Sequence, residues 1–161
     1  MPSDEVRVVF DCNMFVQALL SPYGAAASCL EVAKRGDITL FVSPPVLAEI
    51  REVLQRPAIA KRLPSLTPEK VDAFLEDAIA NSTLLRNVPE KFHYERDPED
   101  EPYINLAVAA GARYIVSRDK DLLSLMTGIT DDCKEFRQRN RLLKVVQPLE
   151  FLRTLTLTKT Q

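Results

Sequence analysis

The sequence predicts an α/β protein built on a parallel sheet, and two observations indicate this fold. Short apolar runs typical of buried strands alternate with segments whose apolar residues repeat every three or four positions, as in helices. Parallel neighbours in a sheet need a long crossover, which an intervening helix supplies, so we expect helices on both faces. The 161 residues, 46% of them apolar, are enough for one compact domain with a buried core.

Four runs of alternating or continuous apolar residues are the candidate strands: 6–10, 38–42, 113–117 and 142–146. Between the first two, the segment 25–35 has a helical pattern and ends at Gly36, a residue suited to the left-handed conformation that follows many helices. After the second strand, apolar residues at helical spacing from Val46 to Leu54 predict another helix, which we expect Pro57 to end.

The second half of the chain continues the alternation. Thr67-Pro68-Glu69 has the proline of a first helical turn and opens the clearest amphipathic pattern in the chain. A helix over about 102–111 leads into the third candidate strand, and Pro148 opens the last helix. We expect the core to span about residues 6–152 and the tail 153–161, which ends in LTLTKTQ, to be poorly ordered.

Composition excludes several classes of protein. Lys and Arg number 21 against 23 Asp and Glu, so the chain as a whole is not a polybasic nucleic-acid binder, and a polyanion would need a local patch or metal ions. Cys12, Cys29 and Cys133 are an odd number without CxxC spacing, which argues against a disulfide framework and a zinc ribbon. The start MPSDEVRVVF lacks the cationic region of a signal peptide, and no apolar run suits a membrane span, so we expect a cytoplasmic protein.

Carboxylates gather where the predicted strands end. Asp11 follows the first strand directly, and Glu49 lies in the helix after the second strand. Asp119 and Asp121 follow the third strand. The segment RDPEDEP places four more at the start of the helix before that strand, where the helix dipole favours anions: Asp97, Glu99, Asp100 and Glu101. Because sites in open α/β sheets form at the carboxyl ends of strands, we expect these acids at one edge of the sheet.

Each acid also has a purely structural interpretation: Asp97 and Asp100 as helix caps, Glu49 as a solvated helix residue and Asp119 as part of a turn. Their accumulation favours a metal site instead. Two carboxylates about 4 Å apart repel by roughly 1 kcal/mol in water and about 4 kcal/mol near a protein surface. A hard cation such as Mg²⁺ or Mn²⁺ prefers carboxylate and water oxygens and would relieve this repulsion. For the single histidine, His93, we expect a surface or packing role.

Three segments, taken in order, resemble one family of enzymes. They are the first strand with its DCN, then SPPVLAEIREVL, then DPEDEPYINLAVAAGARYIVSRDKDLL, and together they resemble the PIN-domain ribonucleases, specifically toxin components of toxin-antitoxin pairs. The resemblance covers about residues 6–152 and implies a single domain over 1–161, a three-layer sandwich with four to five parallel strands. It further implies a Mg²⁺- or Mn²⁺-dependent endoribonuclease that acts on RNA, forms a homodimer and has an antitoxin protein as partner.

The resemblance also assigns site residues. The carboxylates that match the family's catalytic metal ligands are Asp11, Glu49, Asp100 and Asp119. The surrounding residues are Asn13 and Ser117, which match polar residues that orient the ligands, and Asp97 and Asp121, which would be outer groups or alternative ligands. Cys12 stands where the family usually has threonine. Because a thiol is a weaker hydrogen-bond donor than a hydroxyl, we expect reduced support for Asp11.

One basic segment and two other classes of function complete the interpretation. In KEFRQRNRLLK, the side chains of Arg137, Arg139 and Arg141 form either an RNA-contacting patch beside the site or a solvated face. HAD-type phosphatases also carry an aspartate after their first strand and would use Asp11 as nucleophile, but they usually place a second aspartate where this chain has Asn13. The non-enzymatic alternative is a domain that only binds RNA or a protein, with the acids as helix caps.

Overall fold

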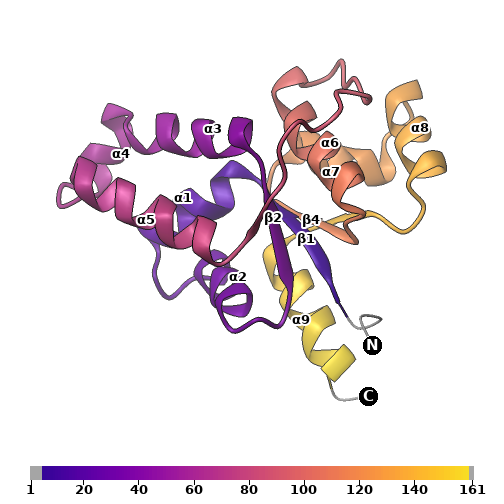
Figure 1. Ribbon diagram of the computed structural model, residues 1–161. Helices are drawn as coiled ribbons and strands as arrows, with labels where there is room; N and C mark the ends of the chain where they lie inside the picture. Colours follow the sequence, from indigo (N-terminus) through magenta and orange to yellow (C-terminus); the bar gives the residue numbers. More distant parts are fainter. Residues whose placement is uncertain (1–4, 160–161) are drawn as a thin grey trace.

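A computed structural model describes residues 5–159, and Figure 1 shows a central sheet surrounded by helices. The strands of this sheet are β1 (Arg7–Phe10), β2 (Thr39–Val42), β3 (Thr83–Leu84), β4 (Tyr114–Val116) and β5 (Lys144–Val146). They are parallel and lie in the order β3-β2-β1-β4-β5. The predicted parallel sheet is confirmed. The two-residue β3 was not recognisable in the sequence because so short an edge strand has no periodic pattern.

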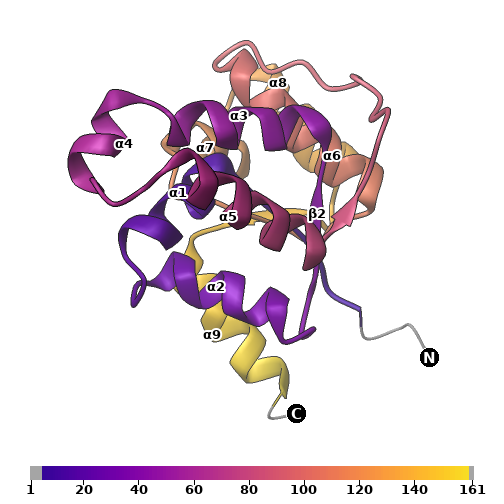
Figure 2. The same cartoon turned by 60° about the vertical axis from the view of Figure 1, so that its left-hand side comes forward.

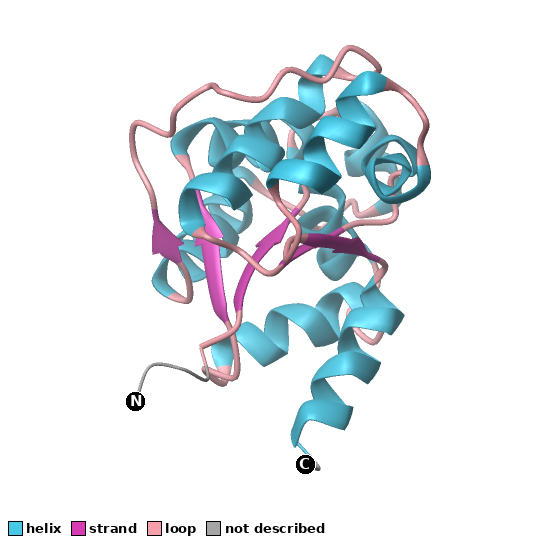
Figure 3. Ribbon diagram, turned by 90° about the vertical axis from the view of Figure 1, so that its right-hand side faces the viewer, coloured by secondary structure: helices cyan, strands magenta, loops and turns pink. Residues whose placement is uncertain are grey.

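Helices connect the strands and cover both faces of the sheet (Figure 3). They are α1 (Cys12–Leu20), α2 (Ala25–Lys34), α3 (Pro44–Leu54), α4 (Pro57–Arg62), α5 (Pro68–Ala80), η2 (Pro98–Asp100, a 3₁₀ turn), α6 (Glu101–Ala110), α7 (Lys120–Thr127), α8 (Asp131–Arg139) and α9 (Pro148–Lys159). Helix α6 packs on β1, β2 and β4, and α2 packs against α9 (Figure 2). Within residues 5–159, no helix has the length and apolar character needed to cross a bilayer.

The helices expected at 25–35, after the second strand, after Thr67, before Gly111 and after Pro148 are confirmed. Helix α1 was not predicted from the sequence; its residues are mostly apolar, and among them only Asn13 is exposed. Pro57 does more than end α3. It occupies the first turn of α4, where its missing N–H is not needed and its fixed φ suits the helix.

The core is centred on β1, which is covered on both faces. Val8 and Val9 are 0% exposed. The Phe10 ring lies 6.2 Å from the ring of Phe15 in α1 and 6.2 Å from that of Phe151 in α9, measured between centroids. The chain therefore leaves β1 at Asp11 inside the protein, and the first carboxylate of the site is only 5% exposed.

The C-terminal segment differs from expectation. Helix α9 continues to Lys159, so residues 153–159 are helical, while residues 160–161 lie outside the described part of the chain. Leu155 is buried, and Leu152, three positions earlier on the same face, is half-buried. The alternation of leucine and threonine in this segment does not show which leucines are buried, because the residues that pack against them come from other parts of the fold.

Replacing Leu155 by alanine should test the packing of this helix. We expect Leu155→Ala to lower the free energy of unfolding by about 2 kcal/mol or more, because the substitution leaves a cavity in the core. Leu149→Ala is the matched control, since Leu149 is 58% exposed on the same helix. Urea denaturation measures both, and equal stability of the two variants would contradict the packing described here.

Candidate metal centre

The ends of β1 and β4 are joined by a network around Ser117. The backbone N–H of Asp11 donates to the Val116 carbonyl at 3.3 Å, so the two chain ends stay together. Asp11 caps α1, its Oδ1 accepting from the Met14 N–H at 3.1 Å. Ser117, 0% exposed, donates its hydroxyl to Asp11 Oδ2 and accepts the N–H of Asp119 at 2.9 Å. One serine thus holds two of the predicted ligand residues in place.

A tight group of four acids lies at this edge. Each contributes an oxygen, and these oxygens all lie within 4.8 Å of one another: Asp97, Asp100, Asp119 and Asp121. Asp97 caps η2 by accepting the Glu99 N–H at 3.1 Å, and Asp119 caps α7 by accepting the Asp121 N–H at 2.8 Å. Structural capping and membership of the group therefore coexist in the same residues, and the two interpretations of the acids do not exclude each other.

Asp100 carries the clearest sign that a cation belongs here. The residue is 7% exposed, and its Oδ2 is fully buried without a hydrogen-bond partner among the described residues. Burial, together with repulsion from Asp119 and Asp97, raises the pKa of Asp100 to about 8. A buried carboxylate oxygen without a partner is costly, whereas a divalent cation would supply the missing partner and favour the ionised form. The all-oxygen donor set suits Mg²⁺ or Mn²⁺.

Asp11 and Glu49 lie next to this group. Burial raises the pKa of Asp11 to about 6, and repulsion from Asp119 and Glu49 adds to the rise, while the hydrogen bonds from Ser117 and Met14 oppose it. The Glu49 carboxylate accepts a hydrogen bond from the Tyr103 hydroxyl. Asp11 and Glu49 are absent from the four-acid group with the 4.8 Å spacing. The four predicted ligands Asp11, Glu49, Asp100 and Asp119 therefore lie at one edge of the sheet. Asp97 and Asp121, predicted as outer groups or alternative ligands, belong to the compact group with Asp100 and Asp119.

Asn13 and Cys12 lie directly after Asp11 in the chain, at the start of α1. Asn13 is exposed on the first turn of α1, and among the described residues the hydrogen bonds to the Asp11 carboxylate come from Met14 and Ser117. Cys12 is 8% exposed, and burial raises the pKa of its thiol to about 12, helped by the negative charges of Glu49 and Asp11. Cys12 is therefore a neutral thiol. The reduced support for Asp11 expected from Cys12 in place of threonine stays a prediction.

Two residues of the site were not found in the sequence. Arg96 donates from Nε to Asp121 Oδ1 at 2.6 Å, so its guanidinium places a positive charge beside the group of acids. Its only signal was its position at the start of RDPEDEP. Tyr103 is 3% exposed and orients Glu49. It follows Asp100 by three positions, and such residues share a helix face, so the spacing was a usable signal.

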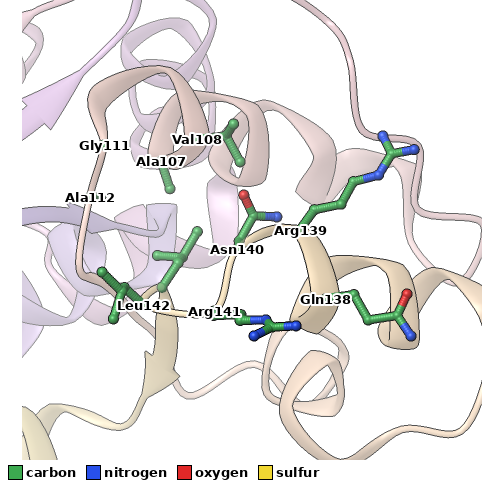
Figure 4. Close-up of a pocket in the computed structure, with 10 residues that line it drawn as sticks. Ala107, Val108, Gly111, Ala112, Gln138, Arg139, Asn140, Arg141 and Leu142 are labelled. Atoms are coloured by element: carbon green, nitrogen blue, oxygen red, sulfur yellow. The ribbon is translucent and has the colours of Figure 1, made fainter.

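The basic segment lies elsewhere. The guanidinium of Arg137 donates hydrogen bonds to the carbonyls of Leu125 and Gly128, both at 2.8 Å, and so ties α8 to the end of α7. Arg139 and Arg141 line a cavity of about 410 Å³ with Gly111 and Ala112, the residues just before β4 (Figure 4). Because β5 runs parallel to β4, the chain must return to the starting edge of the sheet before β5 begins. The patch therefore lies at the edge opposite the acids, and not beside them.

The fold and the site together define the class of this protein: a parallel α/β domain with a cluster of carboxylates at the carboxyl edge of its sheet. The PIN domain family model matches residues 7–121, and the chain belongs to the PIN-domain family. PIN domains are generally nucleases that use divalent metals. This membership replaces the HAD-type interpretation that Asp11 alone left open.

Two individual proteins are similar to the chain. The uncharacterised protein MJ1680 of Methanocaldococcus jannaschii is 31% identical over 152 residues, which cover 94% of this chain and 93% of that protein. The structure is similar to that of VapBC2 from Rickettsia felis bound to a DNA fragment from their promoter, with a TM-score of 0.51 and 16% identity over 88% of this chain and 98% of that one. The second likeness concerns the fold, because its sequence identity is low.

The raised carboxyl pKa values predict a pH-dependent stability. Above pH 4 the unfolded chain releases the Asp100 proton, while the folded protein keeps it up to about pH 8 and the Asp11 proton up to about pH 6. In EDTA, the free energy of unfolding should therefore fall as pH rises from 4 to 8, by at most about 1.4 kcal/mol per pH unit for each group. Urea titrations at several pH values measure this slope.

Asp100→Asn is the control for the upper half of this range, because the amide does not titrate. The variant should lose the slope between pH 6 and 8, and Mn²⁺ should flatten it in the wild type by stabilising the ionised carboxylates. An unchanged slope in Asp100→Asn would show that another group is responsible.

Tyr103→Phe should weaken metal binding without disturbing the core, because it removes only the hydroxyl that orients Glu49. We expect the Kd for Mn²⁺ to rise about tenfold, the lower end of the range for outer-shell partners of metal ligands. Isothermal titration calorimetry measures the change, and Tyr23→Phe is the control because Tyr23 is fully exposed. Equal Kd values for the two variants would mean that the hydrogen bond from Tyr103 to Glu49 does not support metal binding.

Proposed function

We propose that this protein is a Mg²⁺- or Mn²⁺-dependent endoribonuclease that hydrolyses RNA phosphodiester bonds, and that it acts as the toxin of a toxin-antitoxin pair. The observation that carries the proposal is the buried, unpartnered Oδ2 of Asp100 inside a group of four acids. Membership of the PIN-domain family supports the nuclease part. The sequence resemblance to toxins and the shared fold with VapBC2 support the toxin part.

In this proposal, Asp11, Glu49, Asp100 and Asp119 hold the cation. The fit rests on their oxygen donors and on the missing partner of Asp100. When bound, the cation would lower the pKa of a water molecule and neutralise charge on the phosphate as the bond breaks. Asp97 and Asp121 add negative charge close to Asp100 and Asp119, so they either complete the ligand set or accept hydrogen bonds from water around it.

The remaining residues position these ligands. Ser117 keeps Asp11 and Asp119 together through its two hydrogen bonds. Tyr103 donates a hydrogen bond to Glu49, which is close enough to Asp11 for their charges to repel. The Asp11 and Asp119 carboxylates are also the candidates to accept a proton from the attacking water. Rigid support of this kind matters because catalysis depends on holding the reacting groups in one geometry.

RNA must be attracted to a protein of net charge −2. Three arginines are candidates for phosphate contacts: Arg96, which pairs with Asp121, Arg118, which precedes Asp119 and is exposed, and Arg56, which pairs with Glu52 and is more weakly attracted by Glu49. Arg139 and Arg141, at the opposite edge, would contact only an RNA long enough to pass around the domain. Counterion release makes such binding dependent on salt.

The proposed partners are RNA, a second copy of the chain and an antitoxin protein. The sequence resemblance implies all three, and the VapBC2 assembly from Rickettsia felis, an antitoxin-toxin complex bound to promoter DNA, is consistent with the antitoxin. We also propose a cytoplasmic location, which fits an RNA-cleaving toxin. A non-catalytic RNA- or protein-binding domain is the alternative that the experiment below separates.

The direct test is cleavage of structured and single-stranded RNAs by the wild type with Mg²⁺, with Mn²⁺ or with EDTA. We expect cleavage only with a divalent cation, and a loss of at least about 100-fold in Asp11→Asn and Asp100→Asn, because each substitution removes a charged metal ligand. Glu76→Gln is the matched control, since it neutralises an exposed acid on α5, outside the site.

Three outcomes separate the alternatives. Metal-dependent cutting that both variants lose supports the nuclease. Cutting that persists in both variants, or in EDTA, would contradict the acidic centre as its source. Calorimetry that detects Mn²⁺ binding to the wild type without cleavage of any RNA would favour the non-catalytic alternative.

A further inference from the structure

A second cavity, of about 200 Å³, lies beside the metal centre at the same edge of the sheet. Ser43, on its wall, follows β2 as Asp11 follows β1, and these two strands pair directly in parallel. Neighbouring strands are about 4.8 Å apart, so this wall is one strand along the sheet from Asp11. Pro98 and Glu101, also on the wall, stand on either side of Asp100 in the chain. The cavity therefore lies next to the proposed catalytic site, although none of the acids of that site lines it.

The walls of this cavity are apolar surfaces that donate few hydrogen bonds. Pro45, Pro98 and Pro102 contribute rigid rings and have no backbone N–H, and Val88 adds an apolar side chain. The Asn105 side chain also reaches the wall, but its amide is engaged with the backbone of Phe92, accepting its N–H at 2.8 Å and donating to its carbonyl at 3.3 Å.

The polar groups of the cavity are mainly acceptors. Glu90 and Glu101 present carboxylates, which when ionised accept hydrogen bonds only. Glu101 is held in place, with Oε2 accepting the Tyr94 N–H at 2.8 Å and Oε1 lying 3.7 Å from His93 Nδ1. Glu90 lies exposed in the segment that follows β3. The hydroxyl of Ser43, which is 2% exposed, does not cap α3 and can both donate and accept, whereas the Asn105 amide is already engaged with Phe92. A ligand of this cavity must therefore be flat and rich in donors.

We propose that this cavity binds the guanine base of the RNA nucleotide next to the cleaved phosphate, an inference that rests on the proposed ribonuclease function. The N1–H and N2 amine of guanine are adjacent donors that one carboxylate accepts together, and Glu90 supplies it because Glu101 is already engaged. The guanine O6 accepts from Ser43, and the ring lies between the proline rings. Adenine, cytosine and uracil each turn a ring nitrogen or carbonyl acceptor toward the carboxylate. Proteins read unstacked RNA bases by this combination of stacking and edge contacts.

The test uses binding and not cleavage, so that it stands apart from the nuclease activity. Fluorescein-labelled pentanucleotides UUNUU, with guanine, inosine, adenine, cytosine or uracil at N, are titrated with the full-length protein in EDTA, and fluorescence anisotropy gives each Kd. Inosine is the sharpest probe, because it differs from guanosine only by lacking the N2 amine. We expect guanine to bind about tenfold more tightly than the three other natural bases, in the range for a bidentate contact to a base.

Glu90→Gln completes the design as a double-mutant cycle. In the wild type, inosine should bind several-fold more weakly than guanine, and in Glu90→Gln the two should bind equally. The matched control Glu76→Gln should retain the wild-type difference. Because Glu90 is exposed, its substitution is not expected to affect folding.

The outcomes are separable. Equal binding of guanine and inosine by the wild type, or a guanine preference that persists in Glu90→Gln, would overturn the guanine site even if the protein cuts RNA. Guanine-selective binding that Glu90→Gln abolishes would support the site even if no RNA is cut, in which case the nuclease proposal alone would fail. Binding that ignores the base at N would likewise overturn the guanine site, because it would show that the protein contacts the backbone and does not read the base.

Discussion

The mutual repulsion of buried carboxylates is the constraint on which the site depends. A parallel sheet sends every strand end to the same edge, and here that edge collects Asp11, Asp119 and, from the helix between strands, Asp100. The protein offsets part of this repulsion: the Ser117 hydroxyl donates to Asp11, and the Arg96 guanidinium donates to Asp121. Oδ2 of Asp100 has no hydrogen-bond partner among the described residues. The energetic cost of its position is the physical reason to expect a cation.

The same edge carries two kinds of chemistry side by side. Over the ends of β1 and β4, oxygen donors converge as a hard cation requires, and over the end of β2 a small cavity combines proline walls with hydrogen-bond acceptors. Asp100 and Glu101 are consecutive residues, the first in the group of acids and the second on the wall of the cavity. If both proposals hold, an RNA bound by its base in the cavity and by its phosphate at the acids would be positioned by contacts at rigid helix starts.

Much of the fold and part of the site followed from local patterns. The strands that form the middle of the sheet and the amphipathic helices were recognisable because burial imposes a period on their apolar residues. The exceptions have physical causes. Helix α1 is mostly apolar with only Asn13 exposed, β3 has two residues, and the leucines of α9 find their partners only in the folded protein. Arg137 illustrates the limit for charges, since its guanidinium satisfies two backbone carbonyls that no local pattern could have identified.

The sequence by itself determined which residue types stand at the strand ends, and hence that acids would meet at one edge, because the direction of parallel strands leaves no other arrangement. The tertiary structure decided how they meet. It joined Asp97 and Asp121 to Asp100 and Asp119, set Glu49 under Tyr103, turned Asn13 to solvent and placed Arg139 and Arg141 at the far edge. Most of these arrangements involve residues that are far apart in the chain. They depend on side-chain packing in three dimensions, which the spacing of residues along the sequence does not encode.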